Sequence, residues 1–271
     1  MEASLSRSGY RMRPSTVADR SDIAEHIFGD VEVAKTLVHN VSSRTGALNA
    51  TDAWIDTLAI DGSRNAGNPE HLGLWTIRDE TNDNQFVAIR GVFVAPGLPD
   101  NSVAIFVAVA RAYWGRGVSG DSSRLLCRQV FERSDCDAIY TRVWPKLNPA
   151  SDAVQRRLGF VPAERHTLKD TFGEQRMREV LEFDLWRASN LPDEGYEETL
   201  RQISIRIGQL AAEDLLDLQQ ATRRIIAALP DDIAQTATVH SQISKDLQIG
   251  HQNPAWASYC MSRDTWAASA R

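Results

Sequence analysis

The sequence has few cysteines, and they are poorly placed for cross-linking. Cys127, Cys136 and Cys260 are the only three in 271 residues, and no two of them form a CxxC pair. An odd number at these spacings argues against a disulfide framework and against a zinc knuckle. We therefore expect a cytoplasmic protein stabilised by burial alone, and its length suffices for one large domain plus an accessory segment.

Long apolar runs and an excess of basic residues are also missing. No run reaches the roughly 18 apolar residues of a membrane span, and the N-terminus lacks the apolar core of a signal peptide. The formal net charge is -6, whereas general nucleic-acid binders carry clustered Lys and Arg. His39, His71 and His166 show no ligand spacing. These features predict that the protein binds no membrane, no nucleic acid and no metal.

What the sequence does contain is a series of strand-like segments. Residues 72–78 and 85–95 are apolar runs separated by the polar turn ETNDN, which predicts a hairpin. Residues 103–110 are apolar almost throughout, so we expect a central strand that is covered on both faces. Three strands that follow one another in this way indicate an antiparallel meander. A short strand at 10–13 and a helix at 21–28 are predicted before them.

A loop with three glycines joins the third of these strands to a helix predicted at 121–133. Gly115, Gly117 and Gly120 permit positive φ and close approach of the backbone to a ligand. A helix start adds unpaired N–H groups and the positive end of a dipole, and together these features hold phosphate groups. We infer that a phosphate-bearing cofactor docks at 114–120.

The next segments complete the sheet as the sequence predicts it. A strand at 138–144 follows the helix, which makes a βαβ crossover and a parallel strand pair. Pro149 suits the first turn of another helix, which Gly159 ends. Residues 166–171 and 176–185 are predicted to form a closing hairpin. The result is an α/β (α+β) fold, a mixed and mostly antiparallel sheet with helices on its faces.

The composition changes from Leu191 onward. Apolar residues recur there at helical spacing up to Leu229, and Pro230 breaks the pattern and begins a second helix. The pattern predicts a helical hairpin that packs against the first domain or against a second subunit of a homodimer. We therefore divide the chain into domains at 1–187 and 188–271.

Two local motifs resemble those of one enzyme superfamily. The first is Tyr113-Trp114-Gly115-Arg116-Gly117, and the second is Asn148-Pro149-Ala150-Ser151 followed by Leu158-Gly159-Phe160. About thirty residues apart, in a strand-loop-helix-strand context, the pair is far more specific than either motif alone. It resembles the GNAT superfamily of acyl-CoA N-acyltransferases, in particular the branch that acetylates N-termini of ribosomal proteins and related amines. The resemblance covers about residues 10–187.

The resemblance implies a fold and a donor. In GNAT folds the central parallel strands splay apart and the pantetheine arm of acetyl-CoA, or of another acyl-CoA, lies in the gap, here bonded to the backbone near Val107 and Val109. The pyrophosphate is then expected on main-chain amides of the glycine loop, namely Trp114, Gly115, Arg116, Gly117, Val118, Ser119 and Gly120. Neither a metal nor a covalent enzyme intermediate is required.

The second motif supplies the expected catalytic residues. By the match, Asn148 bonds the pantetheine arm or its neighbouring backbone, and the Ser151 hydroxyl lies near the leaving thiolate, where it can donate a hydrogen bond. A backbone N–H near Val109 stabilises the oxyanion. The alternative is that Asn148 and Ser151 only cap the helix that they precede, since both residue types are preferred caps.

One departure from the family concerns the general base. Many relatives have an acidic residue in the strand before the loop, whereas residues 103–106 here contain no carboxylate. Deprotonation is left to solvent, to another carboxylate such as Asp100, or to an amine that arrives neutral. The acceptor, a small amine or a peptide N-terminus, is expected against the variable loops at 33–51 and 61–71, near a helix predicted at 51–59.

Three functions remain open at this point. The first is an acetyl-CoA-dependent N-acetyltransferase that acts by direct attack of an amine on the thioester. The second is an acyltransferase that uses a longer acyl-CoA or an acyl carrier protein as donor. The third is a catalytically idle CoA-binding protein, which the missing carboxylate makes worth testing.

Overall fold

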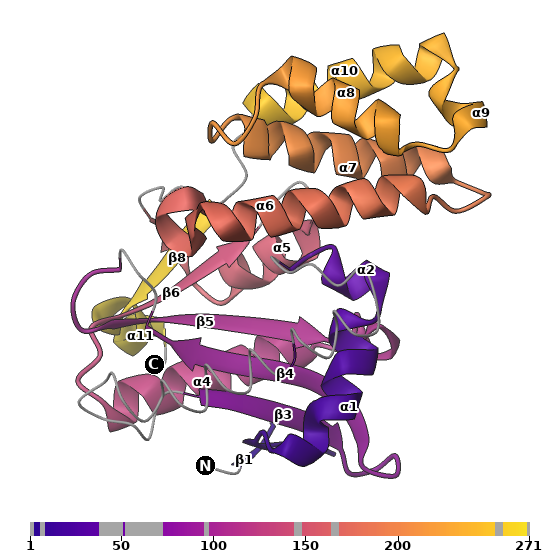
Figure 1. Ribbon diagram of the computed structural model, residues 1–271. Coiled ribbons are helices and arrows are strands. Elements are labelled where there is room, and N and C mark those ends of the chain that lie inside the picture. Colours follow the sequence, from indigo (N-terminus) through magenta and orange to yellow (C-terminus); the bar gives the residue numbers. More distant parts are fainter. Residues whose placement is uncertain are drawn as a thin grey trace.

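The structure is a computed structural model, and it describes residues 3–5, 9–37, 51, 73–94, 98–143, 148–163, 168–252 and 257–269. Within these residues one sheet of eight strands has the order β1-β2-β3-β4-β5-β6-β8-β7 (Figure 1). Its strands are β1 (Ala3–Ser4), β2 (Tyr10–Pro14), β3 (Gly73–Asp79), β4 (Gln85–Phe93), β5 (Ser102–Val109), β6 (Ala138–Val143), β7 (Val161–Pro162) and β8 (Ala257–Ser262).

The predicted meander and crossover are confirmed. Strands β2 to β5 pair antiparallel in chain order, and β5 pairs with β6 in parallel. The β3–β4 turn has left-handed φ values of 47° at Asp83 and 56° at Asn84, which Asp and Asn tolerate best among non-glycine residues. The crossover between β5 and β6 contains the short η4 (Arg111–Tyr113) and helix α4 (Val118–Arg133).

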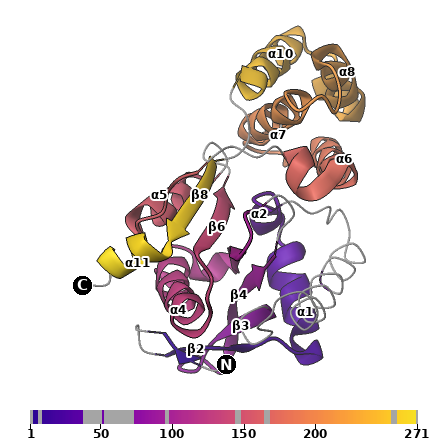
Figure 2. The same ribbon diagram turned by 90° about the vertical axis from the view of Figure 1, so that its left-hand side faces the viewer.

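Helices cover both faces of the sheet (Figure 2). Helix α4 and helix α5 (Pro149–Arg157) lie on one face, and a chain of short helical segments lies on the other. Those segments are η1 (Val17–Asp19), α1 (Arg20–Ile23), η2 (Ala24–Phe28) and α2 (Val31–Ala34). The helix predicted at 21–28 therefore forms, as α1 and η2, and its second part is wound as a π-helix. The helix predicted at 51–59 and the loop predicted at 61–71 lie outside the described residues, apart from Thr51.

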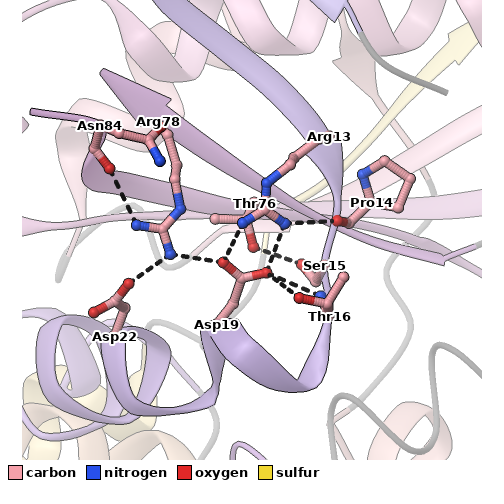
Figure 3. Close-up of polar contacts among 9 residues, drawn as sticks. All are labelled: Arg13, Pro14, Ser15, Thr16, Asp19, Asp22, Thr76, Arg78 and Asn84. Atoms are coloured by element: carbon pink, nitrogen blue, oxygen red, sulfur yellow. Dashed lines mark hydrogen bonds and ion pairs between the residues drawn. The ribbon is translucent and has the colours of Figure 1, made fainter. Parts of the chain in front are cut away.

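A partly buried ion-pair network holds η1 and α1 against the sheet (Figure 3). Arg13 of β2 donates two hydrogen bonds to Asp19, of 2.7 and 2.8 Å, and Arg78 of β3 donates to Asp19 at 2.7 Å and to Asp22 at 2.5 Å. Burial alone would raise the pKa of Asp19, but the hydrogen bonds from the two arginines and from the Thr16 N–H outweigh it and hold that pKa at about 2. Asp19 therefore stays charged and fastens the N-terminal helical segment.

The predicted closing hairpin is wrong. Residues 168–171 and 176–185, which were expected to form its strands, belong instead to one long helix, α6 (Leu168–Ser189), and residues 166 and 167 lie outside the described residues. The alternation of Leu181, Phe183 and Leu185 looks like a strand because the helix has two apolar sides. Leu181 and Leu185 pack in a helical core, and Phe183 packs in the core of the sheet. Figure 1 shows α6 lying between the sheet and the helices of residues 196–252.

The predicted helical hairpin is a bundle of more elements. The apolar residues that recur up to Leu229 were expected to lie on one helix, but the helix ends before Asp214, where φ is 60°. Asp217 then starts a new helix with a capping box. The described helices there are α7 (Tyr196–Ala211), α8 (Leu218–Ala228), α9 (Asp231–Ala234) and α10 (Ala237–Gln252).

Helices α7 and α10 contact each other main chain to main chain. A Cβ added at Gly208 would lie 2.1 Å from the carbonyl oxygen of Leu247, and one added at Gly250 would lie 2.0 Å from that of Ile205. Only glycine allows such an approach, so these two positions set the spacing of the bundle.

The chain returns to the sheet after the bundle. Strand β8 pairs with β6 along six residues, and Arg263, at the start of α11 (Arg263–Ser269), donates to the carbonyl oxygens of Phe131, Ser134 and Cys136 at the end of α4. The range predicted as a helical extension is therefore not helical throughout. The division into two domains stays a prediction.

Candidate active site at the split between two parallel strands

Strands β5 and β6 pair at one end only. Three register pairs join them, and the last is Ala104 with Tyr140. Beyond Ala104, β5 continues to Val109 and keeps its partner β4, while β6 continues to Val143 with its other partner β8. The two central parallel strands therefore part, as the resemblance implies, and a gap opens beside the second half of β5.

Main-chain groups of β5 face this gap. The Ala110 N–H donates to the Val87 carbonyl at 2.9 Å, and the register pairs Val109 with Ala88. In an antiparallel ladder successive residues point their N–H and C=O groups to alternate sides. The groups of Val107 and Val109 consequently point away from β4 and toward the gap, where strand-like bonds to a ligand are possible.

The loop after β5 is anchored through Tyr113. Its ring is buried and packs edge-on against Tyr10, and its hydroxyl lies 3.4 Å from Asp79 Oδ2 and 3.3 Å from Gln85 Oε1. Burial raises the pKa of Tyr113, so its hydroxyl stays neutral. The Arg116 guanidinium carbon lies 4.8 Å from the Tyr113 ring centroid, which is cation–π distance. The loop is thereby held in place beside the β3–β4 hairpin.

Two positions of the loop require glycine because of their backbone conformation. Gly115 has φ of 74° and Gly117 has φ of 81°, both in the left-handed region. Gly117 is the N-cap of α4 and supplies no side-chain cap, so the helix begins at Val118 rather than at 121 as predicted. The expected ligand amides of Val118, Ser119 and Gly120 thus belong to the first helical turn, whose N–H groups have no partner within the helix.

The space in front of this turn is open. A Cβ added at Gly115 or at Gly120 would meet no atom within 4 Å. The unpaired N–H groups and the helix dipole both favour a negative ligand there, and Arg116 is exposed beside it. Asp121 of the same turn lies 3.6 Å from Arg124. These residues fit a diphosphate, so the loop and the gap together suit the two ends of a CoA molecule.

The side chain of Trp114 has a role that the sequence did not indicate. Its indole Nε1 donates to the Val109 carbonyl at 2.8 Å, while 46% of the residue stays exposed. One of the four main-chain groups that face the gap is therefore already occupied. The Val109 N–H and both groups of Val107 are left for a ligand.

Asn148 and Ser151 lie at the start of α5. Asn148 Oδ1 accepts from the Ser151 N–H at 3.0 Å, which is the capping geometry held open as the alternative. The Ser151 side chain is half-buried, and its hydroxyl donates to no group among the described residues. Capping thus uses the Asn148 side chain and the Ser151 backbone, and it leaves the Ser151 hydroxyl available. Their predicted part in catalysis stays a prediction.

Tyr259 supports this turn from a distant part of the chain. Its buried hydroxyl on β8 donates to Asp152 Oδ1, and Arg156 Nε donates to Asp152 Oδ2 at 3.0 Å. The hydrogen bond from Tyr259 lowers the pKa of Asp152 and keeps it an acceptor. Sequence reasoning missed this contact because the two residues are 107 positions apart.

Two neighbouring aromatic residues, Phe106 on β5 and Phe93 on β4, were also missed. The Phe106 ring lies over Gly91, where an added Cβ would come within 1.8 Å of it, and 6.2 Å separate its centroid from that of Phe93. Both rings are partly exposed. A glycine inside a strand is the sequence signal for such a close approach.

Asp100 is too far from the gap to act as the base. It is exposed in the turn before β5, whereas the gap lies beside the opposite end of that strand. Eight residues of strand separate the two ends, and at roughly 3.3 Å a residue they span about 25 Å. No carboxylate takes its place on β5.

Among the residues that the structure describes, no group of three or more His, Cys, Asp and Glu side chains could hold a metal ion. Nor is any described helix long and apolar enough to cross a membrane.

Comparison with known proteins agrees with this architecture. Residues 10–161 match the family model of the acetyltransferase (GNAT) domain. No curated protein matches the sequence.

The solved structures that are similar to this chain have low sequence identity to it. They include a GNAT-family acetyltransferase from Bacillus anthracis, with 14% identity over 60% of this chain and 86% of that one and a TM-score of 0.46. A ribosomal-protein-S5-alanine acetyltransferase from Vibrio fischeri has 14% identity over 62% of this chain and 86% of that one, with a TM-score of 0.47. A spermidine N-acetyltransferase from Vibrio cholerae, in complex with CoA and spermine, has 14% identity over 61% of this chain and 88% of that one, with a TM-score of 0.46.

The family model covers more than half of the chain and includes the split strands, the glycine loop and α5. The protein belongs to the GNAT acetyltransferase family. Acetyl-CoA or another acyl-CoA is accordingly its donor, and acyl transfer is its class of reaction.

Proposed function

We propose that the protein is a cytoplasmic N-acetyltransferase that moves the acetyl group of acetyl-CoA to a primary amine, on a small molecule or a peptide N-terminus. The observation that carries this proposal is the end of β5–β6 pairing at Ala104, which leaves the groups of Val107 and Val109 directed into a gap next to the glycine loop. A thioester arm fits along such an edge, with its diphosphate on the first turn of α4.

The chain's own residues have distinct roles in this proposal. Main-chain amides from Trp114 to Gly120 hold the diphosphate, and Val107 orients the pantetheine arm. The acceptor nitrogen attacks the thioester carbonyl, forming a C–N bond, while the Val109 N–H stabilises the oxyanion. The C–S bond then breaks, and the Ser151 hydroxyl donates a hydrogen bond to the departing sulfur, which takes up a proton. The excess proton of the amine leaves through water.

Binding and turnover separate this proposal from its alternatives. Calorimetric titration with acetyl-CoA, a longer acyl-CoA and an acylated carrier protein identifies the donor. Mass spectrometry of a panel of polyamines and N-terminal peptides then detects a gain of one acetyl group. Binding of acetyl-CoA without product on any amine would favour the idle CoA-binding protein, and no heat with any CoA species would end the proposal.

Two glycines offer a matched pair of variants. Gly117 and Gly195 are both left-handed N-caps of sixteen-residue helices, with φ of 81° and 70°. Alanine is strained at either position, by roughly 1–2 kcal/mol. We expect Gly117→Ala to raise the dissociation constant of acetyl-CoA about tenfold or more, because the N–H groups of the turn move. Gly195→Ala should lower stability similarly and leave acetyl-CoA affinity unchanged.

Ser151→Ala tests the second motif. Loss of the hydroxyl should lower kcat about tenfold and leave the KM for acetyl-CoA nearly unchanged, because the cap uses the Ser151 backbone and the Asn148 side chain. An unchanged kcat would leave Ser151 with a capping role only.

A further inference from the structure

One arginine is buried between the sheet and the helix that follows the glycine loop. Arg90 of β4 is 1% exposed, and it pairs in register with Trp75 of β3 and Val107 of β5. Its Nη1 donates to Ser123 Oγ of α4 at 3.0 Å. The guanidinium group therefore lies under α4, one strand away from the edge that faces the gap.

The charge of this guanidinium group is not matched by a carboxylate of the described residues. Its Nε and Nη2 are buried and have no hydrogen-bond partner among those residues. The Cys127 thiol interacts with it, but burial raises the pKa of Cys127 to about 12, so the thiol is neutral. Burial also lowers the pKa of Arg90, to about 10, which still leaves Arg90 charged near neutral pH. A buried charge without a partner is costly.

A short relay connects Arg90 to the first turn of α4. Ser123 Oγ, which accepts from Arg90, donates to the Ser119 carbonyl at 2.7 Å. Ser119 belongs to the turn whose N–H groups are expected to hold the diphosphate, and four residues of helix span about 6 Å along its axis. A diphosphate on that turn would thus lie roughly 10 Å from the guanidinium group.

At that separation the charge of Arg90 affects an anion appreciably. With an effective dielectric constant of about 20, two unit charges roughly 10 Å apart change a binding constant about tenfold. The field of Arg90 adds to the positive end of the helix dipole. Asp121 of the same turn lies 3.6 Å from Arg124, which offsets its negative charge.

We propose that Arg90 is a buried counter-charge for the diphosphate of acetyl-CoA, so that the negative partner of this arginine arrives with the donor. The inference rests on the proposed function, in which the diphosphate lies on the first turn of α4. Arg90 acts through its electric field and not by contact. It therefore increases the affinity for the donor and does not take part in the chemical step.

Calorimetric titration with acetyl-CoA tests the role of the charge. Arg90→Met and Arg90→Gln, which keeps an amide donor near Ser123, should each raise the dissociation constant about tenfold. The control is Arg11→Met, which removes an exposed cation of the same sheet that pairs with Glu80, and it should leave the constant unchanged.

The outcomes of this titration are distinct. Wild-type affinity in both Arg90 variants would overturn this inference alone, whereas a wild type that binds no acetyl-CoA would overturn the proposed function with it. Wild-type affinity in Arg90→Gln only would assign the effect to the hydrogen bond with Ser123, and the role of the charge would then be wrong.

A truncated donor separates the charge from a structural role. S-acetyl-pantetheine has the thioester and the arm of acetyl-CoA but no diphosphate. In Arg90→Met the kcat/KM for acetyl-CoA should fall about tenfold, while the kcat/KM for S-acetyl-pantetheine should stay at the wild-type value. An equal fall for both donors would indicate a distorted strand next to Val107 and would contradict the proposal.

Discussion

Two arginine–aspartate networks lie at opposite ends of the N-terminal helical segment, and they differ in burial. In the first, the side chains of Arg13 and Asp22 are 28% and 33% exposed. At the start of the segment, Arg13 and Arg78 face Asp19 and Asp22, so two positive charges meet two negative ones. This network joins short helices to neighbouring strands of one sheet (Figure 3).

At the other end of that segment the network is buried almost completely. Arg187 and Arg206 both pair with Asp184, and none of the three residues is more than 4% exposed. Arg206 also donates to the Lys35 carbonyl at the end of α2. Removing one partner of a buried ion pair is far more damaging than removing one partner of an exposed pair. The comparison teaches that the second network depends more strongly on each of its members than the first.

Removing the shared carboxylate of the second network should have the largest effect. Asp184→Asn takes away the buried carboxylate with which both Arg187 and Arg206 pair, and we expect the free energy of unfolding to fall by about 3–5 kcal/mol in urea titration. Glu182→Gln on the same helix breaks only the exposed pair with Arg224, and it should cost less than about 1 kcal/mol. Equal losses in the two variants would show that the buried charges are compensated elsewhere.

The first network should tolerate the same change better. Asp19→Asn leaves Arg78 its second partner, Asp22, so a loss of about 2 kcal/mol is expected. Glu80→Gln, which removes the exposed partner of Arg11, is the matched control and should change stability little.

The stability difference between the wild type and Asp19→Asn should depend on pH in a definite direction. The pKa of Asp19 is about 2 in the folded protein and 3.8 without the fold's contacts, so Asp19 stabilises the protein above pH 3.8. This contribution disappears as the pH falls from 3.8 toward 2. The wild type and Asp19→Asn should therefore differ by a constant amount near neutral pH and converge below pH 4. A difference that stayed the same down to pH 2 would mean that the charge of Asp19 is not what matters.

Local patterns predicted the sheet and the glycine loop well because both depend on residues close in sequence. Alternating strands around the ETNDN turn formed the expected hairpin, and Gly115 and Gly117 have the left-handed φ values that their residue type suggests. The start of α4 was placed three residues late because Gly117, a cap without a side chain, gives no polar signal.

The bundle and its attachment to the sheet region were less predictable because their contacts are long-range. Helix α6 packs on two cores, so its pattern imitates a strand, and β8 joins the sheet about a hundred residues after its neighbour β6. Asp184 and Arg206 would ordinarily be assigned to a solvated helix face. They are buried because they pair with each other across two helices, and the periodicity of residues within one helix does not reveal such a pairing.

A third buried arginine extends the comparison to a site where no carboxylate of the described residues pairs with the guanidinium, and it should show the smallest effect. Arg90 is 1% exposed beneath α4 and donates to Ser123 Oγ at 3.0 Å, and its Nε and Nη2 have no hydrogen-bond partner among the residues that the structure describes. Burial accordingly lowers the pKa of Arg90 to about 10. Because an unpaired buried charge gains little from its surroundings, Arg90→Met should change the unfolding free energy by less than about 1 kcal/mol, or raise it. Arg90→Ala, which leaves a cavity, should cost about 3 kcal/mol. If Arg90→Met were as damaging as Asp184→Asn, pairing with a carboxylate would not be what distinguishes these sites.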